Sequence, residues 1–132
     1  MKRKCILVLV VIVILFALGM LCYKIAVEEI KINSKDVSKI SIFNGTTGQC
    51  VEIIDEGDIE YFINNLNAVQ MKRSGVSLLY TGYHYRVTIF KGDGIYIEFI
   101  INSANAIRKD PFFYNVEEGE IDVDFIESLF IK

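Results

Sequence analysis

The sequence predicts an α+β protein: an N-terminal transmembrane helix followed by one small domain with a mostly antiparallel sheet and two helices. Residues 5–23 form an uninterrupted apolar run. Several later segments alternate apolar and polar residues as half-buried strands do, and two others repeat apolar residues at helical spacing. We divide the chain into a cytoplasmic tip and transmembrane anchor at 1–27, a connector at 28–36 and an extracytoplasmic domain at 37–132.

The apolar run is long enough to cross a bilayer. A hydrocarbon core about 30 Å thick needs about 20 helical residues, and the run reaches that length when residues 25–27 are added. Signal peptides usually have an apolar region of about 7–15 residues followed by small residues at a cleavage site. Here large apolar residues continue through Leu21. We therefore expect the lipid bilayer to surround residues 5–23, and secretion after signal-peptide cleavage is the alternative.

Basic residues at the start of the chain indicate its orientation. Lys2, Arg3 and Lys4 precede the apolar run, whereas residues 24–31 offset two lysines with two glutamates. Lysine and arginine beside a first span tend to stay in the cytoplasm. We expect a single-pass protein of the cell membrane with a cytoplasmic N-terminus and the domain outside.

The charge of the exterior part argues against nucleic acid as a partner. Without the three basic residues of the tip, 11 basic residues remain against 17 acidic ones, a net charge of about −6. Binding to a phosphate backbone requires a basic surface. The remaining length of about 100 residues fits one small domain.

Cysteine positions exclude a disulfide inside the domain. Cys5 and Cys22 belong to the apolar run, so Cys50 is the only cysteine of the exterior part. A lone thiol of this kind is either an inert small residue or a site of intermolecular pairing. The redox state of Cys50 stays open.

The first expected hairpin begins with a strand at residues 37–43, in which apolar and polar residues alternate. A turn rich in Asn, Gly and Thr follows, and alternation then resumes. Pairing Ile42 with Val51 keeps one face apolar. This register predicts that Cys50 lies off the core face, beside Phe43.

A helix is predicted over residues 55–66, with Asp55 as its N-terminal cap. Its apolar residues repeat at helical spacing and form one stripe: Ile59, Phe62, Ile63 and Leu66. A short strand at 69–73 follows the helix.

Residues 74–82 have no clear period and are predicted to form a loop. A solvated loop is usually polar, but this one carries four large apolar residues: Val76, Leu78, Leu79 and Tyr80. Contiguous exposed apolar groups often mark contact sites. We predict contact with an envelope protein or peptide here. The alternative is that these residues fold under the sheet and complete the core.

The firmest strands are predicted at 83–91 and 95–102, joined by a glycine-rich turn. A three-residue loop pairs Ile89 with Ile97 and keeps one face apolar, with Gly94 in the left-handed conformation. The other face of this hairpin carries a weak candidate polar site: His84, Arg86 and Glu98. Arg86 and Glu98 are diagonal neighbours and close enough to pair.

Two short strands at 106–109 and 112–116 and a turn at 117–120 are predicted to precede a closing helix at 121–130. The apolar residues of this helix share one side: Ile121, Phe125, Ile126, Leu129 and Phe130.

Catalytic and metal-binding motifs are not found in the sequence. The chain has one histidine, so a nucleophile and base pair would have to use His84. Acidic residues between 117 and 124 lack the spacing of a calcium loop and fit a helix N-terminus instead. We predict no cofactor, no metal and no small-molecule ligand.

The order of these features resembles that of uncharacterised small single-pass membrane-anchored extracytoplasmic proteins of Gram-positive bacteria. The resemblance rests on the basic tip and span, the strand motif Asp36-Val37-x-x-Ile-x-Ile, the turn Asn-Gly-Thr-Thr-Gly, the Asp-capped helix ending Leu66-Asn67, the tyrosine-rich hairpin and the closing motif Ile-Asp-x-Asp-Phe-Ile-x-x-Leu-Phe. It implies location and domain shape, and it assigns no catalytic residue.

Two functional hypotheses follow. The first is a membrane-tethered extracytoplasmic binding or accessory module, without enzymatic activity, whose edge strands are available to a partner. The alternative is a small envelope hydrolase that uses carboxylates near His84.

Overall fold

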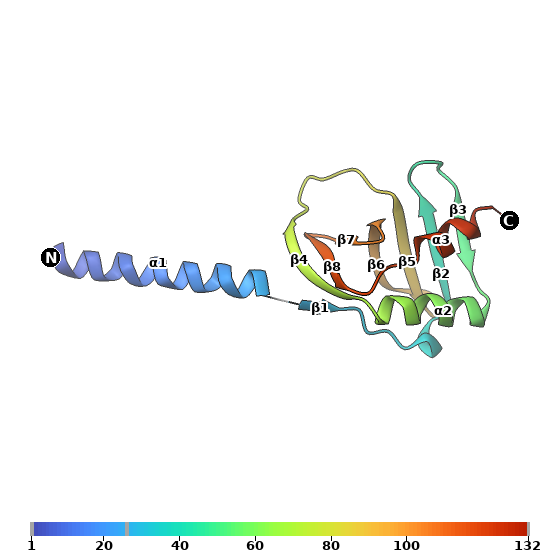
Figure 1. Cartoon of the computed structure of the whole chain (residues 1–132), viewed down its shortest axis with the longest axis horizontal. Helices are drawn as coiled ribbons and strands as arrows, with labels where there is room; N and C mark the ends of the chain where they lie inside the picture. Colours follow the sequence, from blue (N-terminus) through green and yellow to red (C-terminus); the bar gives the residue numbers. More distant parts are fainter. Residues whose placement is uncertain (1, 26, 132) are drawn as a thin grey trace.

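The computed structural model describes residues 2–25 and 27–131, and the side chains of residues 2–22 and 30–131. An apolar helix, α1 (Lys2–Ile25), projects from one end of an α+β domain (Figure 1). Its segment Lys2–Cys22 has the length and composition needed to cross a membrane, which signal sequences also have.

The domain is built on one antiparallel sheet, as predicted. Eight strands of the described residues follow the order β1-β4-β8-β7-β6-β5-β2-β3, each antiparallel to its neighbours. The strands are β1 (Val27–Glu29), β2 (Lys39–Asn44), β3 (Cys50–Ile53), β4 (Gln70–Val76), β5 (Tyr85–Lys91), β6 (Gly94–Ser103), β7 (Ala106–Lys109) and β8 (Phe112–Glu118). β1 and β3 are therefore the two edges of this sheet.

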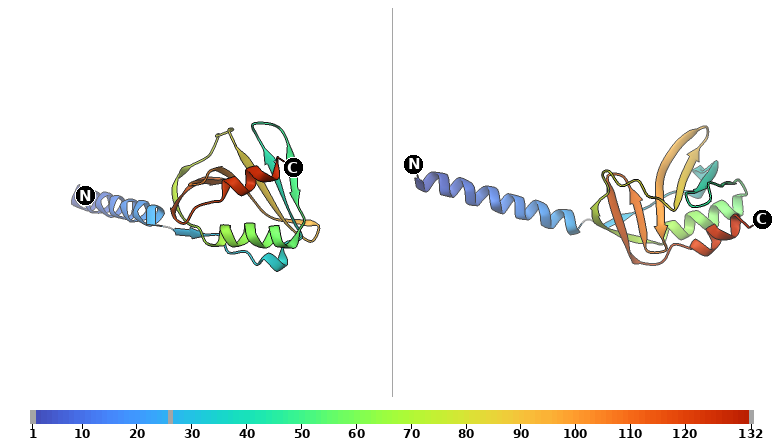
Figure 2. Two further views of the ribbon diagram at one scale, coloured as in Figure 1. Left: turned by 45° about the vertical axis from the view of Figure 1, so that its right-hand side comes forward. Right: turned by 90° about the horizontal axis from the view of Figure 1, so that it is seen from above.

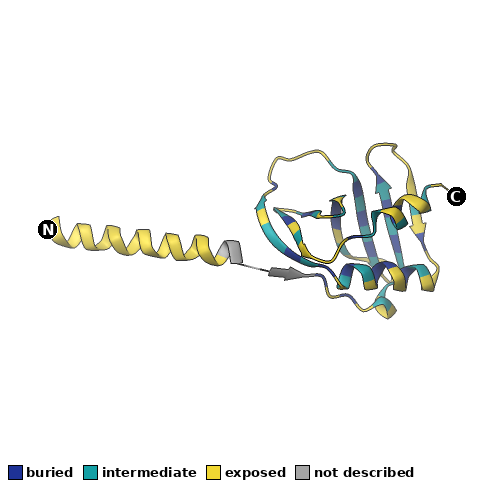
Figure 3. Cartoon of the chain, viewed as in Figure 1, coloured by how far each residue is buried: buried dark blue, intermediate teal, exposed yellow. Residues whose placement is uncertain are grey.

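Helices α2 (Glu56–Asn67) and α3 (Val123–Leu129) lie side by side on one face of the sheet (Figure 2). The carboxylate of Asp55 caps α2 by accepting hydrogen bonds from the N–H groups of Gly57 and Asp58. Buried residues gather on the inner side of α2 and on the facing strands (Figure 3). The predicted stripe of α2 is confirmed, because all four of its residues belong to the core: Ile59, Phe62, Ile63 and Leu66.

The register predicted for the first hairpin is confirmed. Ile42 pairs with Val51, and Phe43 pairs with Cys50. Ile40 and Ile42 are fully buried, whereas Cys50 is exposed. Alternation alone specifies this register, because a slip by one residue would turn the apolar side chains toward solvent.

The second hairpin has the predicted pairing, but its turn was predicted wrongly. Ile89 pairs with Ile97, yet the turn holds two residues, and Gly92 rather than Gly94 has a positive φ of 60°. The extra residue is Tyr96, which forms a bulge in β6. A bulge adds one residue to one strand and so shifts its alternation. The pairing of Ile89 with Ile97 therefore does not require a third residue in the turn.

The end of β4 and the start of the closing helix differ from the prediction. β4 continues to Val76, so the first part of the expected loop is strand, paired through Val76 with Phe112 of β8. An irregularity near Ser74 interrupts the alternation of apolar and polar residues, which explains why the sequence shows no clear strand periodicity here. The closing helix begins later than expected, at Val123. Ile121 is nevertheless buried just before it.

The segment expected as a connector, 28–36, contributes to the domain. β1 pairs with β4, and a short 3₁₀ helix, η1 (Ser34–Asp36), follows. Between them Ile30 and Ile32 are buried and join the core cluster.

Candidate functional site

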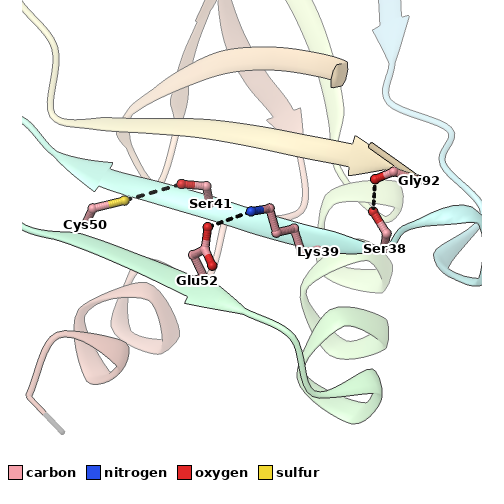
Figure 4. Close-up of polar contacts among 6 residues, drawn as sticks. All are labelled: Ser38, Lys39, Ser41, Cys50, Glu52 and Gly92. Carbon is pink, nitrogen blue, oxygen red and sulfur yellow. Dashed lines mark hydrogen bonds and ion pairs between the residues drawn. The ribbon is translucent and has the colours of Figure 1, made fainter. Parts of the chain in front are cut away.

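Polar side chains of β2 and β3 meet on the sheet face that turns away from the core (Figure 4). Lys39 Nζ lies 2.7 Å from Glu52 Oε1, and the hydroxyl of Ser41 lies 3.3 Å from Cys50 Sγ. The Ser38 hydroxyl donates to the carbonyl oxygen of Gly92 at 2.8 Å. Exposed ion pairs contribute little stability. The contacts of Lys39 and Ser41 join β2 to β3, and that of Ser38 joins the start of β2 to the β5–β6 turn.

The outer edge of β3 has no neighbouring strand among the described residues. Asn44 donates its N–H to the carbonyl oxygen of Gln49 at 2.8 Å. Antiparallel pairs alternate between hydrogen-bonded and non-bonded pairs, so Val51 is the next residue of β3 that bonds to β2. The backbone N–H and C=O groups of Cys50 and Glu52 therefore point away from the sheet, toward solvent.

The predicted polar site around Arg86 is rearranged in the structure. The guanidinium of Arg86 lies over the ring of Tyr83, 4.6 Å from its centroid. Glu98 instead accepts a hydrogen bond from the Thr88 hydroxyl at 3.0 Å. Thr88 is directly opposite Glu98 in the register, whereas Arg86 is diagonal to it, so the hydroxyl is the nearer partner.

His84 stacks on the ring of Tyr85, with centroids 4.1 Å apart. A hollow of about 450 Å³ has Glu98 but not His84 among its lining residues, which are Ile30, Lys31, Ile32, Tyr96, Ile97, Glu98 and Lys109. Among the described residues, no group of three or more His, Cys, Asp or Glu side chains is placed to hold a metal ion. None of these observations favours the hydrolase alternative.

The end of β4 and the loop that follows it expose the apolar residues that the sequence singled out. Leu79 is 99% exposed, and Val76, Leu78 and Tyr80 are each more than half exposed. The alternative that they complete the core is therefore wrong. Tyr80 donates its N–H to the carbonyl oxygen of Ser77 at 3.0 Å, which closes a tight turn with Leu79 at a φ of 68°.

A positive φ is unfavourable for a leucine, so neighbouring contacts must hold the turn. Arg108, only 6% exposed, donates from Nη1 to the carbonyl oxygens of Tyr80 at 3.0 Å and Gly82 at 2.9 Å. The buried Ser77 hydroxyl donates to Asp110 Oδ1 at 2.6 Å. Arg108 Nε lies 3.4 Å from the same oxygen. The loop is thus held by a polar cluster in which Arg108 and Ser77 are buried and Asp110 is exposed.

Local sequence patterns did not single out Arg108 or Ser77. Both lie in segments where a polar residue is ordinarily exposed, and their burial depends on β7 and the β4–β5 loop coming together. The one sign of this cluster in the local sequence was a basic residue, Arg108, two positions before the acidic Asp110.

A second polar cluster joins α2 to α3. The Tyr61 hydroxyl donates to Asp122 Oδ2 at 2.5 Å, and Asn65 Oδ1 accepts from the N–H of Asp122 at 3.0 Å. Asp122 Oδ1 caps α3 by accepting from the N–H of Phe125. The hydrogen bonds that the carboxylate accepts, first from the Tyr61 hydroxyl and then from the Phe125 N–H, lower the pKa of Asp122, and the carboxylate raises the pKa of Tyr61. Of the acidic residues expected at this helix N-terminus, Asp122 caps α3 and Asp124 lies in its first turn, whereas Glu117 and Glu118 belong to β8.

Comparison with family models, curated proteins and solved structures found no match to this chain. The resemblance to small anchored proteins of Gram-positive bacteria stays a prediction. Two surfaces of the domain are candidates for binding: the free edge of β3 and the apolar loop after β4.

Proposed function

We propose that this chain is a membrane-tethered extracytoplasmic module that binds an extended segment of an envelope protein or peptide along the free edge of β3. The observation that carries the proposal is the open edge itself. It lies at the opposite end of the strand order from β1, the strand that follows the apolar helix α1. With α1 in the bilayer and the basic tip in the cytoplasm, this edge faces the envelope.

An extended peptide can add a strand to such an edge. Its main chain would bond to the outward N–H and C=O groups of Cys50 and Glu52, while alternate side chains supply specificity. Ile54, 72% exposed and next to the end of β3, offers an apolar contact. The proposal assigns the chain a binding role rather than catalysis.

The composition of β3 supports this use of the edge. Proteins usually protect free edges with lysine, proline or inward-pointing charge. β3 reads Cys-Val-Glu-Ile, and its one charged residue, Glu52, is paired with Lys39 at 2.7 Å. The edge therefore carries little that would repel an added strand.

The test uses the full chain in its native cells, with a photo-crosslinking amino acid at Ile54. We expect a discrete crosslinked partner that persists in Cys50→Ala and is lost in Cys50→Pro. Proline removes the outward N–H at Cys50 but leaves the bonds between β2 and β3 intact, and it is tolerated at the first residue of an edge strand.

Both variants must accumulate to the same level as the parent chain, which controls for misfolding. An adduct that survives Cys50→Pro unchanged would exclude strand addition at this edge. A complete lack of partner adducts would contradict the binding role.

A further inference from the structure

We infer that the tip of the loop after β4, formed by Leu78, Leu79 and Tyr80, is a second contact with the lipid bilayer that holds α1. The inference rests on the membrane tether in the proposed function. It assigns the loop a lipid surface rather than a protein partner, and the direction of the strands is the first reason.

β4 runs back toward the side of the domain from which α1 leaves. α1 ends at Ile25, and β1 begins at Val27 and leads away from the helix. β4 is antiparallel to β1, with Lys72 opposite Val27. The strand then continues to Val76. The end of β4 and the start of its loop accordingly lie at the end of the domain nearest α1 (Figures 1 and 2).

The dimensions allow the loop to reach the membrane surface. From Cys22, the last residue of the segment able to span a membrane, a helical rise of about 1.5 Å and then a strand rise of about 3.3 Å per residue place Val27 roughly 10 Å beyond the hydrocarbon edge. The four residues of β4 after Lys72 can return by up to roughly 13 Å. At that limit the loop tip would reach the depth of the lipid headgroups, and the test below measures this depth.

The side chains at the tip suit an interface between water and lipid. Leu79 is 99% exposed and Leu78 is 69% exposed. Tyr80 packs edge-on against Phe113, with ring centroids 5.2 Å apart, and its hydroxyl end can stay hydrated. Tyrosine is enriched at this level of membranes. An apolar tip of this kind gains by leaving water.

The loop is also organised before any contact is made. Arg108 holds the carbonyl oxygens of Tyr80 and Gly82, and the turn keeps Leu79 at its left-handed φ. A surface that is already rigid loses little conformational freedom on binding. This explains why an unfavourable backbone conformation is maintained at an apolar residue.

Charge favours the same surface. Residues 70–82 include Lys72 and Arg73 and no acidic residue, although the exterior part as a whole is acidic. Basic residues close to a membrane are attracted to anionic headgroups. Charge within this segment thus favours approach to an anionic bilayer, whereas Glu28 and Glu29 of β1, opposite Met71 and Gln70, oppose it.

The test measures the depth of single probes in the full chain, reconstituted in vesicles of phosphatidylcholine and phosphatidylglycerol. Serine replaces Cys5, Cys22 and Cys50, and one new cysteine carries an environment-sensitive fluorophore. Leu79→Cys reports on the tip, and Leu78→Cys repeats the measurement with an ordinary backbone conformation. Two further probes serve as references: Asp93→Cys in the distant β5–β6 turn and Leu15→Cys in α1.

We expect the probes at the tip to be blue-shifted and quenched by lipids that carry a spin label near the headgroup. The probe at Leu15 is quenched by deep labels, and the probe at Asp93 is not quenched. Both leaflets contain the quencher, so the orientation of the inserted chain does not affect the result.

The outcomes separate the two claims. Quenching at Leu15 but not at the tip overturns the lipid contact and leaves the tether intact. The exposed loop would then be a contact site for a protein partner. Equal quenching at the tip and at Asp93 also overturns it, because the domain would then adhere without preference. An unquenched Leu15 overturns the tether itself.

Discussion

Asn67 binds both backbone polar groups of Ile32. Its Oδ1 accepts from the N–H of Ile32 at 2.9 Å, and its Nδ2 donates to the carbonyl oxygen at 2.7 Å. Asn67 is the last residue of α2, so the two hydrogen bonds fix the segment after β1 on the end of that helix. Ile30 and Ile32 enter the core at this point. The chain next to the apolar helix is thereby locked into the domain.

Replacing Asn67 by alanine should lower the free energy of unfolding by about 2 kcal/mol, because two part-buried hydrogen bonds of about 1 kcal/mol each are lost. Urea unfolding of a fragment covering residues 27–132 measures the effect. Asn64→Ala, at an exposed position of the same helix, is the matched control and should change the stability by less than about 0.5 kcal/mol. Equal effects of the two substitutions would contradict the role of Asn67.

A fragment covering residues 33–132 should be less stable than one covering 27–132. The shorter fragment lacks Ile30 and Ile32, which are 8% and 6% exposed. Burial of an isoleucine side chain contributes about 1.5–3 kcal/mol, so we expect a difference of more than about 3 kcal/mol or loss of cooperative unfolding. Urea unfolding again measures it. Identical midpoints would show that the core does not need this segment.

Asp122→Asn should reduce stability at neutral pH and flatten its dependence on pH in the acid range. The pKa of Asp122 is lowered by its hydrogen bonds to Tyr61 and to the backbone of Phe125. Its carboxylate therefore stabilises the fold fully above about pH 4, the ordinary pKa of an aspartate, and the effect is lost as the pH falls through the lower folded pKa.

Unfolding midpoints of the fragment covering residues 27–132, measured from neutral to acid pH, test this prediction. Asp124→Asn removes a charge from the same helix without removing the cap and is the control. Tyr61→Phe should lose part of the same acid dependence, because it removes one of the two hydrogen bonds to the carboxylate. If the unfolding midpoints of Asp122→Asn and of the parent depend on pH in the same way, the Asp122 carboxylate does not contribute to the acid dependence of stability.

The orientation proposed for the chain predicts that a cysteine at Asp93 reacts with a membrane-impermeant maleimide in intact cells. The free cysteines Cys5, Cys22 and Cys50 must first be replaced by serine, so that the label reports on one site. Labelling that requires lysis would place the domain in the cytoplasm and reverse the orientation derived from charge.

The sequence by itself determined the elements whose apolar pattern is local. Asp55 and the residues that follow it specify α2, because the cap and the stripe lie within one helix. Alternation fixed the pairing of Ile42 with Val51 and of Ile89 with Ile97, because only one parity keeps both partners on the core face. The exposed apolar residues near Leu79 were also visible as an unusual composition.

The tertiary structure decided everything that depends on residues distant in sequence. The bulge at Tyr96 took the place of a longer turn. One extra residue, whether in the strand or in the turn, keeps the same apolar side chains on the core face, so the sequence pattern does not distinguish the two. Burial of Arg108 depends on carbonyl groups about 26 residues away, in a loop with no period. The pairing of β1 with β4 directs the apolar loop toward α1. Local periodicity carries no information on these contacts, because their free energy arises only when separate segments meet.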